Sequence, residues 1–155
     1  MKNKLILISL ILLPLLVGSL SAAFMGNNIQ TWYATLQKPS FNPPNYLFGP
    51  VWSILYLLMG ISLILIYKSP ISKNRNNALR MFIIQLGLNF FWSILFFTFH
   101  MILGAFIEII LLWIAIILMI FASYKVNKTS AYLQVPYLLW VTFATVLNAS
   151  ILLLN

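Results

Sequence analysis

Residues 31–56 read TWYATLQKPSFNPPNYLFGPVWSILY and hold four of the seven prolines in the chain and two of its five tryptophans. Pro43 and Pro44 remove two successive main-chain donors and restrict the residue before each, so we expect residues 38–45 to be extended or turned. A helix follows, with Pro50 about one turn inside it, where a missing N–H is tolerated. The segment is therefore predicted to be a stiff aromatic loop that leads into a helix. Such a loop either covers a pocket or is a plain interfacial connector, which is common in membrane proteins.

The composition around this segment is that of an integral membrane protein. The 155 residues are 63% hydrophobic and 6% charged, more apolar than a soluble domain of this size could bury. The absence of cysteine excludes disulfides, thiolate metal sites and cysteine nucleophiles. The formal net charge of +8 would suggest nucleic acid as the partner of a soluble protein. Here the basic residues lie in short flanks and loops, so we interpret them as topology determinants and contacts to anionic lipid, with no nucleic-acid partner.

Five apolar segments are long enough to cross a bilayer, which takes about 20 residues. They cover approximately residues 5–25, 46–67, 81–99, 101–124 and 131–154. The connections between them leave no room for a further domain, and the short ones make neighbouring helices antiparallel. We therefore predict one transmembrane domain over residues 1–155. Its fold class is an all-α, five-transmembrane-helix bundle with a proline- and aromatic-rich first loop.

The first segment also has a second interpretation. Two N-terminal lysines, a leucine-rich run and the small residues 19–23 fit a secretory signal peptide. The apolar run, of about 21 residues, is long for the core of a signal peptide. Gly18 and Ala22 have the spacing of a small-xxx-small helix-packing pair. We favour a helix that is retained in the mature protein.

The distribution of basic residues predicts the orientation. With the N-terminus inside, eight Lys and Arg residues lie in inner segments and only Lys38 lies outside. This asymmetry predicts an inner N-terminus and an outer C-terminus, with the proline–aromatic loop on the outer face. Basic inner loops and a lysine-poor outer face suggest a prokaryotic cytoplasmic membrane.

Three of the segments carry aromatic residues and amides on one helical face. The residues concerned are Gln85, Asn89, Trp92 and Phe96 in the third, Trp140, Ala144 and Asn148 in the fifth, and Trp52 with Tyr56 in the second. Amides within a bilayer are costly unless paired, so these faces should point inward and bind a neighbouring helix or a ligand. Trp113 lies mid-segment as well, and core packing remains the alternative role for each of these tryptophans.

Few residues could carry conventional chemistry. Glu108, the only acidic residue, is expected to be neutral or hydrogen-bonded to an amide, because burial disfavours its charged form. A pocket or packing role is favoured over a proton relay, which needs further ionisable groups. His100 is expected to be a loop residue rather than an axial haem ligand. No nucleophile–base pair, carboxylate pair, phosphate loop or metal cluster is present, so we predict neither a metal site nor conventional catalysis.

The motifs together resemble the TspO/MBR family of tryptophan-rich sensory proteins and mitochondrial translocator (peripheral benzodiazepine receptor) proteins. The matching residues run from the first loop to near the C-terminus. They are Thr31-Trp32-Tyr33, Leu36, Lys38-Pro39, Pro43-Pro44, Pro50-Val51-Trp52, Leu55-Tyr56, Gln85-Leu86, Leu88-Asn89, Trp92-Ser93, Val135-Pro136-Tyr137-Leu138-Leu139-Trp140, Phe143-Ala144-Thr145 and Leu147-Asn148.

The resemblance implies a five-helix bundle, often a homodimer, with a pocket under the first loop that binds porphyrins, haem and benzodiazepine-type ligands. It implies no obligatory cofactor, with porphyrin or haem as the ligand. By position, the implied ligand-binding residues are Tyr33, Pro43, Pro44, Trp52, Tyr56, Asn89, Trp92, Trp140 and Ala144. The tail, residues 149–155, lacks the tyrosine and basic residue of the cholesterol-recognition pattern in mitochondrial members.

Three functions follow from this resemblance. The leading one is a sensory or regulatory protein whose outward-facing aromatic pocket binds a tetrapyrrole, with Lys38 available to a propionate. The second is a light-dependent enzyme that degrades protoporphyrin IX, with the roles that the family gives to the tryptophans matching Trp52 and Trp140. The third is transport of porphyrin-like ligands, although inverted repeats and broken midplane helices are not evident in the sequence.

Overall fold

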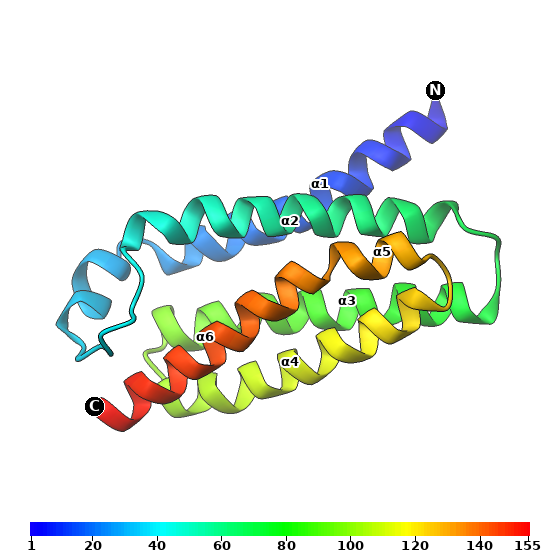
Figure 1. Cartoon of the computed structure of the whole chain (residues 1–155). Helices are drawn as coiled ribbons and strands as arrows, with labels where there is room; N and C mark the ends of the chain where they lie inside the picture. The colour runs from blue at the N-terminus through cyan, green and yellow to red at the C-terminus, as the bar shows by residue number, and fades with distance from the viewer.

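The computed structural model describes all of residues 1–155 and is a bundle of helices joined by short connections (Figure 1). In chain order the elements are α1 (Lys2–Met25), η1 (Ile29–Tyr33), α2 (Asn45–Lys68), α3 (Lys73–Ser93), η2 (Ile94–Thr98), α4 (Ile102–Tyr124), α5 (Lys128–Leu133) and α6 (Val135–Leu154). Five stretches are long and apolar enough to cross a membrane, namely α1, α2, α3 with η2, α4, and α5 with α6. The predicted fold class is confirmed.

Two of the helices that begin earlier than the hydropathy pattern indicates have a capping side chain at their first turn. α3 begins at Lys73 rather than near Met81, because the Ser72 hydroxyl accepts a hydrogen bond from the main-chain N–H three residues later, at 3.1 Å. The Asn127 side chain does the same at 2.9 Å, so α5 begins at Lys128. Hydropathy marks only the part of a helix within the apolar layer, whereas the cap sets its first residue. Several basic residues assigned to loops therefore lie on helix ends.

The fifth span is broken at Gln134, between α5 and α6. Pro136 lies in the first turn of α6, where its missing N–H is tolerated. α2 packs against α5, and α6 packs against α4. Figure 1 shows α6 leaving α2 as it runs toward the C-terminus. The break thus leaves space between α2 and α6 at that end of the bundle.

α1 lies at the side of the bundle and approaches α2 at two glycines. Gly60 of α2 lies against the backbone of Ile11, so that an added Cβ would be 2.5 Å from the Ile11 carbonyl oxygen. Gly18 of α1 lies against the ring of Tyr56. These close approaches hold the middle of α1 against the core. The main core cluster consists of Leu55, Tyr56, Met59, Leu63, Phe82, Leu86, Ile109, Leu112, Ile116, Met119, Tyr137, Val141 and Ala144.

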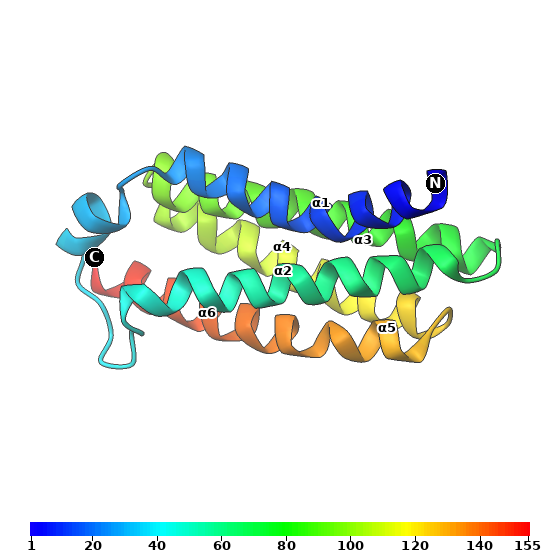
Figure 2. The same cartoon turned by 90° about the horizontal axis from the view of Figure 1, so that it is seen from above.

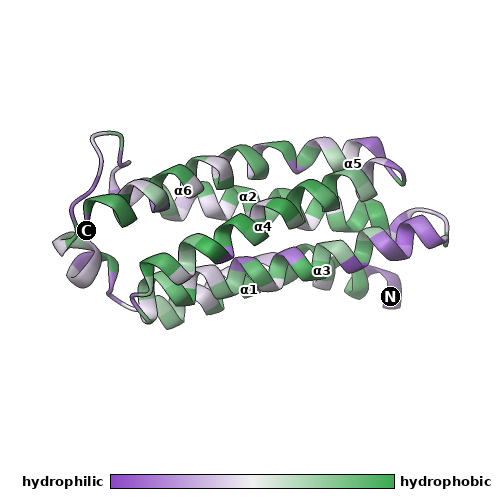
Figure 3. Ribbon diagram, turned by 90° about the horizontal axis from the view of Figure 1, so that it is seen from below, coloured by the Kyte–Doolittle hydropathy of each residue, from purple (hydrophilic) through white to green (hydrophobic).

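The first loop and the C-terminus lie at one end of the bundle, called here the loop end, and the N-terminus lies at the opposite, basic end (Figure 2). Two hydrogen bonds join the loop to the C-terminus, from the Gln37 N–H to Asn155 Oδ1 at 3.0 Å and from Asn155 Nδ2 to the Gln37 carbonyl at 2.8 Å. Hydrophilic residues gather at the two ends, and hydrophobic residues cover the length between them (Figure 3). This pattern suits a bundle that crosses a bilayer lengthwise.

Candidate functional site

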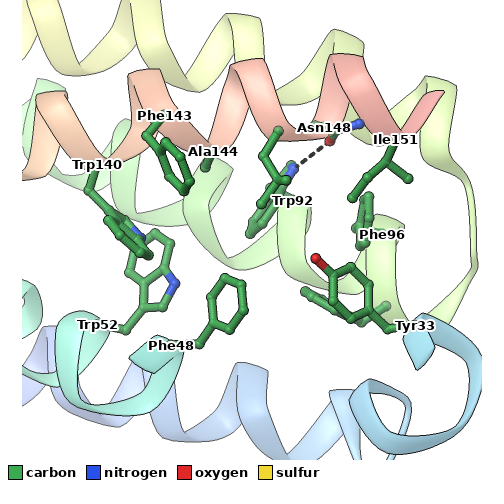
Figure 4. A pocket seen from close by; sticks show the side chains of 12 residues that line it. Tyr33, Phe48, Trp52, Trp92, Phe96, Trp140, Phe143, Ala144, Asn148 and Ile151 are labelled. Atoms are coloured by element: carbon green, nitrogen blue, oxygen red, sulfur yellow. Dashed lines mark hydrogen bonds between the residues drawn. The ribbon is translucent and has the colours of Figure 1, made fainter. Parts of the chain in front are cut away.

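An aromatic chamber lies at the loop end, between α2, the α3–η2 segment and α6, below η1 (Figure 4). Every residue that lines it is hydrophobic except Asn148. Its volume is about 20 Å³, enough for a water molecule but not for a larger ligand. The lining residues are Tyr33, Phe48, Trp52, Trp92, Phe96, Phe97, Trp140, Phe143, Ala144, Leu147, Asn148 and Ile151.

Aromatic edges and faces form the chamber walls. Phe48 lies across from α6, with its ring edge-to-face to Trp140 at a centroid distance of 6.3 Å. The same ring is edge-to-face to Tyr33 of η1 at 6.5 Å. Trp52 and Trp140 lie together at one end of the chamber, as Figure 4 shows. Ala144, one turn after Trp140, presents a methyl group where a larger side chain would fill the space.

Only one indole N–H at the chamber is both buried and unpaired. Trp92 Nε1 donates to Asn148 Oδ1 at 3.1 Å, and Asn148 Nδ2 donates to the Ile102 carbonyl at 3.2 Å. The amide of Asn148 therefore serves the helix packing. Trp140 Nε1 has no hydrogen-bond partner. Because a buried unpaired donor is costly, this N–H is available to an acceptor on a ligand.

A buried polar network lies deeper in the bundle and joins three helices. Tyr56 Oη donates to Asn89 Oδ1 at 2.8 Å, and Asn89 Nδ2 donates to Tyr137 Oη at 2.9 Å. Tyr137 in turn donates to Gln85 Oε1 at 2.8 Å. The sequence predicted that the amides of α3 bind a neighbouring helix or a ligand, and the structure shows a neighbouring helix as the partner of both Gln85 and Asn89. Because each bond joins α3 to α2 or α6, the network fixes the helices that carry the chamber.

A second, larger cavity, called here the side cavity, lies between α1, α2 and α3, and its volume is about 310 Å³. Tyr56 and Asn89 reach it, so the polar network ends at its wall. It shares four aromatic side chains with the chamber, namely Phe48, Trp52, Trp92 and Phe97. A wall of rotatable side chains therefore separates the two spaces.

The first loop closes the chamber through Tyr33, which is 2% exposed. Its hydroxyl donates to Asn42 Oδ1 at 2.6 Å, and burial raises the pKa of Tyr33 to about 12, so the hydroxyl stays protonated. Lys38 Nζ donates to the carbonyls of Tyr33 and Leu36, each at 2.9 Å. The lysine that the sequence offered to a propionate thus folds back and holds the loop.

The structure brings most of the predicted site residues to these two spaces. Tyr33, Trp52, Trp92, Trp140 and Ala144 line the chamber, whereas Tyr56 and Asn89 line only the side cavity. Pro43 and Pro44 line neither, and Pro44 instead caps the N-terminus of α2.

Sequence reasoning missed several residues of the chamber, foremost Phe48, Phe97 and Phe143. Spacing could have found two of them, since Phe48 precedes Trp52 by one turn and Phe143 follows Trp140 by three residues. Phe97 lies in the π-helical turn η2, where the 3.6-residue period no longer applies.

The remaining candidates lie outside both spaces. Glu108 is buried on α4, and neither carboxyl oxygen has a hydrogen-bond partner. Trp113 Nε1 donates to Thr142 Oγ1 at 2.8 Å, which ties α4 to α6. His100 lies in the turn before α4, where its ring stacks on Trp32 at a centroid distance of 4.1 Å.

Comparison with known proteins gives one consistent result. The model of the TspO/MBR family matches residues 10–154. A protein named tryptophan-rich protein TspO from Archaeoglobus fulgidus is 45% identical, over 99% of each chain. A protein of the same name from Chlorobaculum tepidum is 44% identical over 92% of this chain and 91% of that one. The translocator protein of Bos taurus is 35% identical over 88% of this chain and 82% of that one.

Proposed function

The chain belongs to the TspO/MBR family of integral membrane proteins, and we propose that it binds a tetrapyrrole, porphyrin or haem, as a sensory or regulatory protein. The ligand lies in the aromatic chamber below the first loop. A planar conjugated ring gains dispersion and stacking energy from indole and phenyl walls, and a few polar groups orient it.

The unpaired N–H of Trp140 is the observation that carries this proposal. It is buried in a lining that is hydrophobic apart from Asn148, so an apolar ligand without an acceptor would leave it unpaired. A tetrapyrrole supplies both the flat apolar surface and peripheral carboxylate acceptors. A cationic ligand would instead place its positive charge against the N–H donor of Trp140, so a cation fits this chamber less well than a tetrapyrrole.

The ligand also requires the two spaces to merge. A chamber of about 20 Å³ is far below the size of typical ligand pockets, whereas the side cavity of about 310 Å³ is at their lower limit. Rotation of Phe48 and Trp52, which belong to the shared wall, joins the two into one larger site. We therefore expect binding to reorient these rings.

The experiment is a titration of detergent-purified protein with protoporphyrin IX in the dark, followed by tryptophan quenching. Trp140→Phe keeps an aromatic ring at this position but removes the N–H, and its expected effect is a loss of affinity of about tenfold, the value of one hydrogen bond. Ala144→Phe should weaken binding further by filling the chamber. Trp113→Phe, whose indole bonds to Thr142 outside the chamber, is the matched control and should bind normally. Unchanged affinity in both chamber variants would remove this site from consideration.

A second candidate function, light-dependent oxidation of porphyrin by molecular oxygen, is favoured by one specific arrangement. Trp52 stacks on Tyr56 with a centroid distance of 5.5 Å and an interplanar angle of 27°. Tyr56 is hydrogen-bonded to Asn89, so two oxidisable rings lie in series beside the chamber. Illumination of the titrated sample tests this function. New product bands that disappear in Trp52→Phe or Trp140→Phe support it, and stable absorbance supports binding alone.

A further inference from the structure

The side cavity begins where α1 and α2 separate. In the middle of the bundle the two helices touch, with Gly18 against the Tyr56 ring and Gly60 against the Ile11 backbone. Toward the loop end the cavity lies between them. There α1 is held instead to η2, because Thr98 Oγ1 donates to the Phe24 carbonyl at 2.9 Å. The gap is therefore built into the packing of α1.

The opening of this cavity lies between two membrane-spanning helices. Ser19 and Ala22 of α1 and Gly49 and Ser53 of α2 line the cavity and are all exposed. They lie in the last turns of one span and the first turns of the next. In a bilayer this opening faces lipid, in the leaflet at the loop end.

The cavity also presents hydroxyl groups that the protein leaves unpaired. Ser21 is 4% exposed and lines the cavity, yet its hydroxyl has no hydrogen-bond partner in the protein. Other helical serines, such as Ser9 and Ser53, bond to the carbonyl of the preceding turn. A hydroxyl that faces a cavity without a protein partner is free to bond to a ligand group or to water there. Ser21 is thus positioned to bond to a polar group on a molecule in the gap.

The route to the chamber from the water side is closed by the first loop, which several contacts hold in place. The first loop is joined to the C-terminus by the two bonds between Gln37 and Asn155. On its other side, Trp32 stacks on His100, and His100 Nε2 lies 3.1 Å from Asn28 Oδ1. These contacts hold the loop over the chamber from two sides. The side cavity, in contrast, is open without movement of the backbone.

We propose that the gap between α1 and α2 is a lateral portal through which the ligand reaches the aromatic chamber from the bilayer. This inference rests on the proposed function, since the ligand is the same tetrapyrrole. Its flat ring passes between the helices to the shared wall of Trp52 and Trp92, and a carboxylate or carbonyl group bonds to Ser21. An amphipathic ring with acidic edges partitions into a membrane at the depth where this portal lies.

The test measures association rate and affinity separately, in proteoliposomes mixed in the dark with vesicles that carry protoporphyrin IX. Ser53→Phe narrows the opening and should slow the association followed by tryptophan quenching by about tenfold, a larger factor than its effect on the affinity at equilibrium. Ala23→Phe, on the part of α1 that does not line the cavity, is the matched control. The chain has no cysteine, so Gln37→Cys with Asn155→Cys places a single disulfide that locks the loop. The locked protein should bind at the rate of its reduced form.

Two results would overturn the portal while leaving the proposed function intact. One is binding that stops when the loop is locked, and the other is an association rate that Ser53→Phe leaves unchanged. Absence of saturable binding in the wild type would instead remove the proposed function. In that event a bimane label on Ser21→Cys still tests the opening. Quenching by a nitroxide lipid but not by iodide supports a lipid-facing portal, and the reverse contradicts it.

Discussion

Single side-chain atoms decide where the helices of this bundle touch and where they leave space. The indole N–H of Trp140 lacks a partner, and the small side chain of Ala144 leaves the chamber unfilled. Gly18 has no side chain, so the ring of Tyr56 can lie against α1. None of these residues acts as an acid, a base or a nucleophile. At the residue scale, the shape of the cavities and a few unpaired polar atoms therefore define the candidate site. Substitutions of single residues can test both.

Gly18→Ala tests the contact that separates the tight and open parts of the α1–α2 interface. The added methyl group would overlap the Tyr56 ring, so we expect a loss of stability of about 1–3 kcal/mol. Gly87→Ala, where nothing lies within 4 Å of the added carbon, is the matched control and should be neutral or slightly stabilising. Unfolding in mixed micelles measures both. Equal stability of the two variants would show that α1 does not pack at Gly18.

Glu108→Leu, followed by unfolding in mixed micelles, tests whether the buried carboxyl stabilises the fold. Neither oxygen has a partner, so replacement by an apolar side chain of similar size should stabilise the protein, by about 1–3 kcal/mol. Gln85→Leu is the contrast, since it removes a buried amide that accepts from Tyr137 and should destabilise. A less stable Glu108→Leu protein would mean that the carboxyl is paired.

At the scale of elements, the first loop is positioned by the turn between α3 and α4. His100 has a φ of 57°, a left-handed conformation that favours glycine, and its ring lies on Trp32 with an interplanar angle of 11°. A residue other than glycine is strained at such a position, and here its side chain makes a contact that glycine could not make. Here the contact holds η1, and η1 carries Tyr33 into the chamber.

His100→Gly separates the strain of this turn from its contact with the loop. The backbone becomes easier to accommodate, so global stability should be unchanged or rise by up to about 1 kcal/mol. The loop, however, loses the Trp32 stack and the contact with Asn28. We therefore expect faster hydrogen exchange at residues 29–36 only. Protection there equal to the wild type would show that the other ties suffice.

Elements were predictable to the extent that local pattern determines them. Hydropathy predicted five spans, and helical spacing placed Asn89 and Trp92 on one inward face, which the structure confirms. The π-helical turns η1 and η2 were not predictable from the 3.6-residue period, because they interrupt it. The early start of α3 could have been predicted from its N-cap residue, Ser72, although the hydropathy pattern does not indicate it.

At the scale of the molecule, the sequence could not predict how the cavities are divided. The chamber exists because α6 leaves α2 after the break at Gln134, and the side cavity exists because α1 leaves α2 beyond Gly18. Both depend on crossing angles that result from the whole packing. Pattern placed the tryptophans on inward faces, but only the structure shows that four aromatic residues form a shared wall.

The orientation of the whole bundle is the last prediction. Eight basic residues lie toward the basic end and one, Lys38, lies in the first loop, so the basic end should face the cytoplasm. Alkaline phosphatase fused through a linker to Asn155 should be active, and green fluorescent protein at the same place should be dark. A fusion within the loop between α4 and α5 should give the reverse.

Replacing Lys125 and Lys128 with glutamine leaves most of the excess of inner charge, so the orientation should persist. An active phosphatase between α4 and α5 would contradict this assignment and would mean that the orientation in the membrane is reversed.

The orientation also has a consequence for the ligand. With the basic end inside, the chamber and the gap between α1 and α2 both lie in the outer half of the bilayer. A tetrapyrrole would then arrive from the outer leaflet, and vesicles loaded only in that leaflet should supply it fastest.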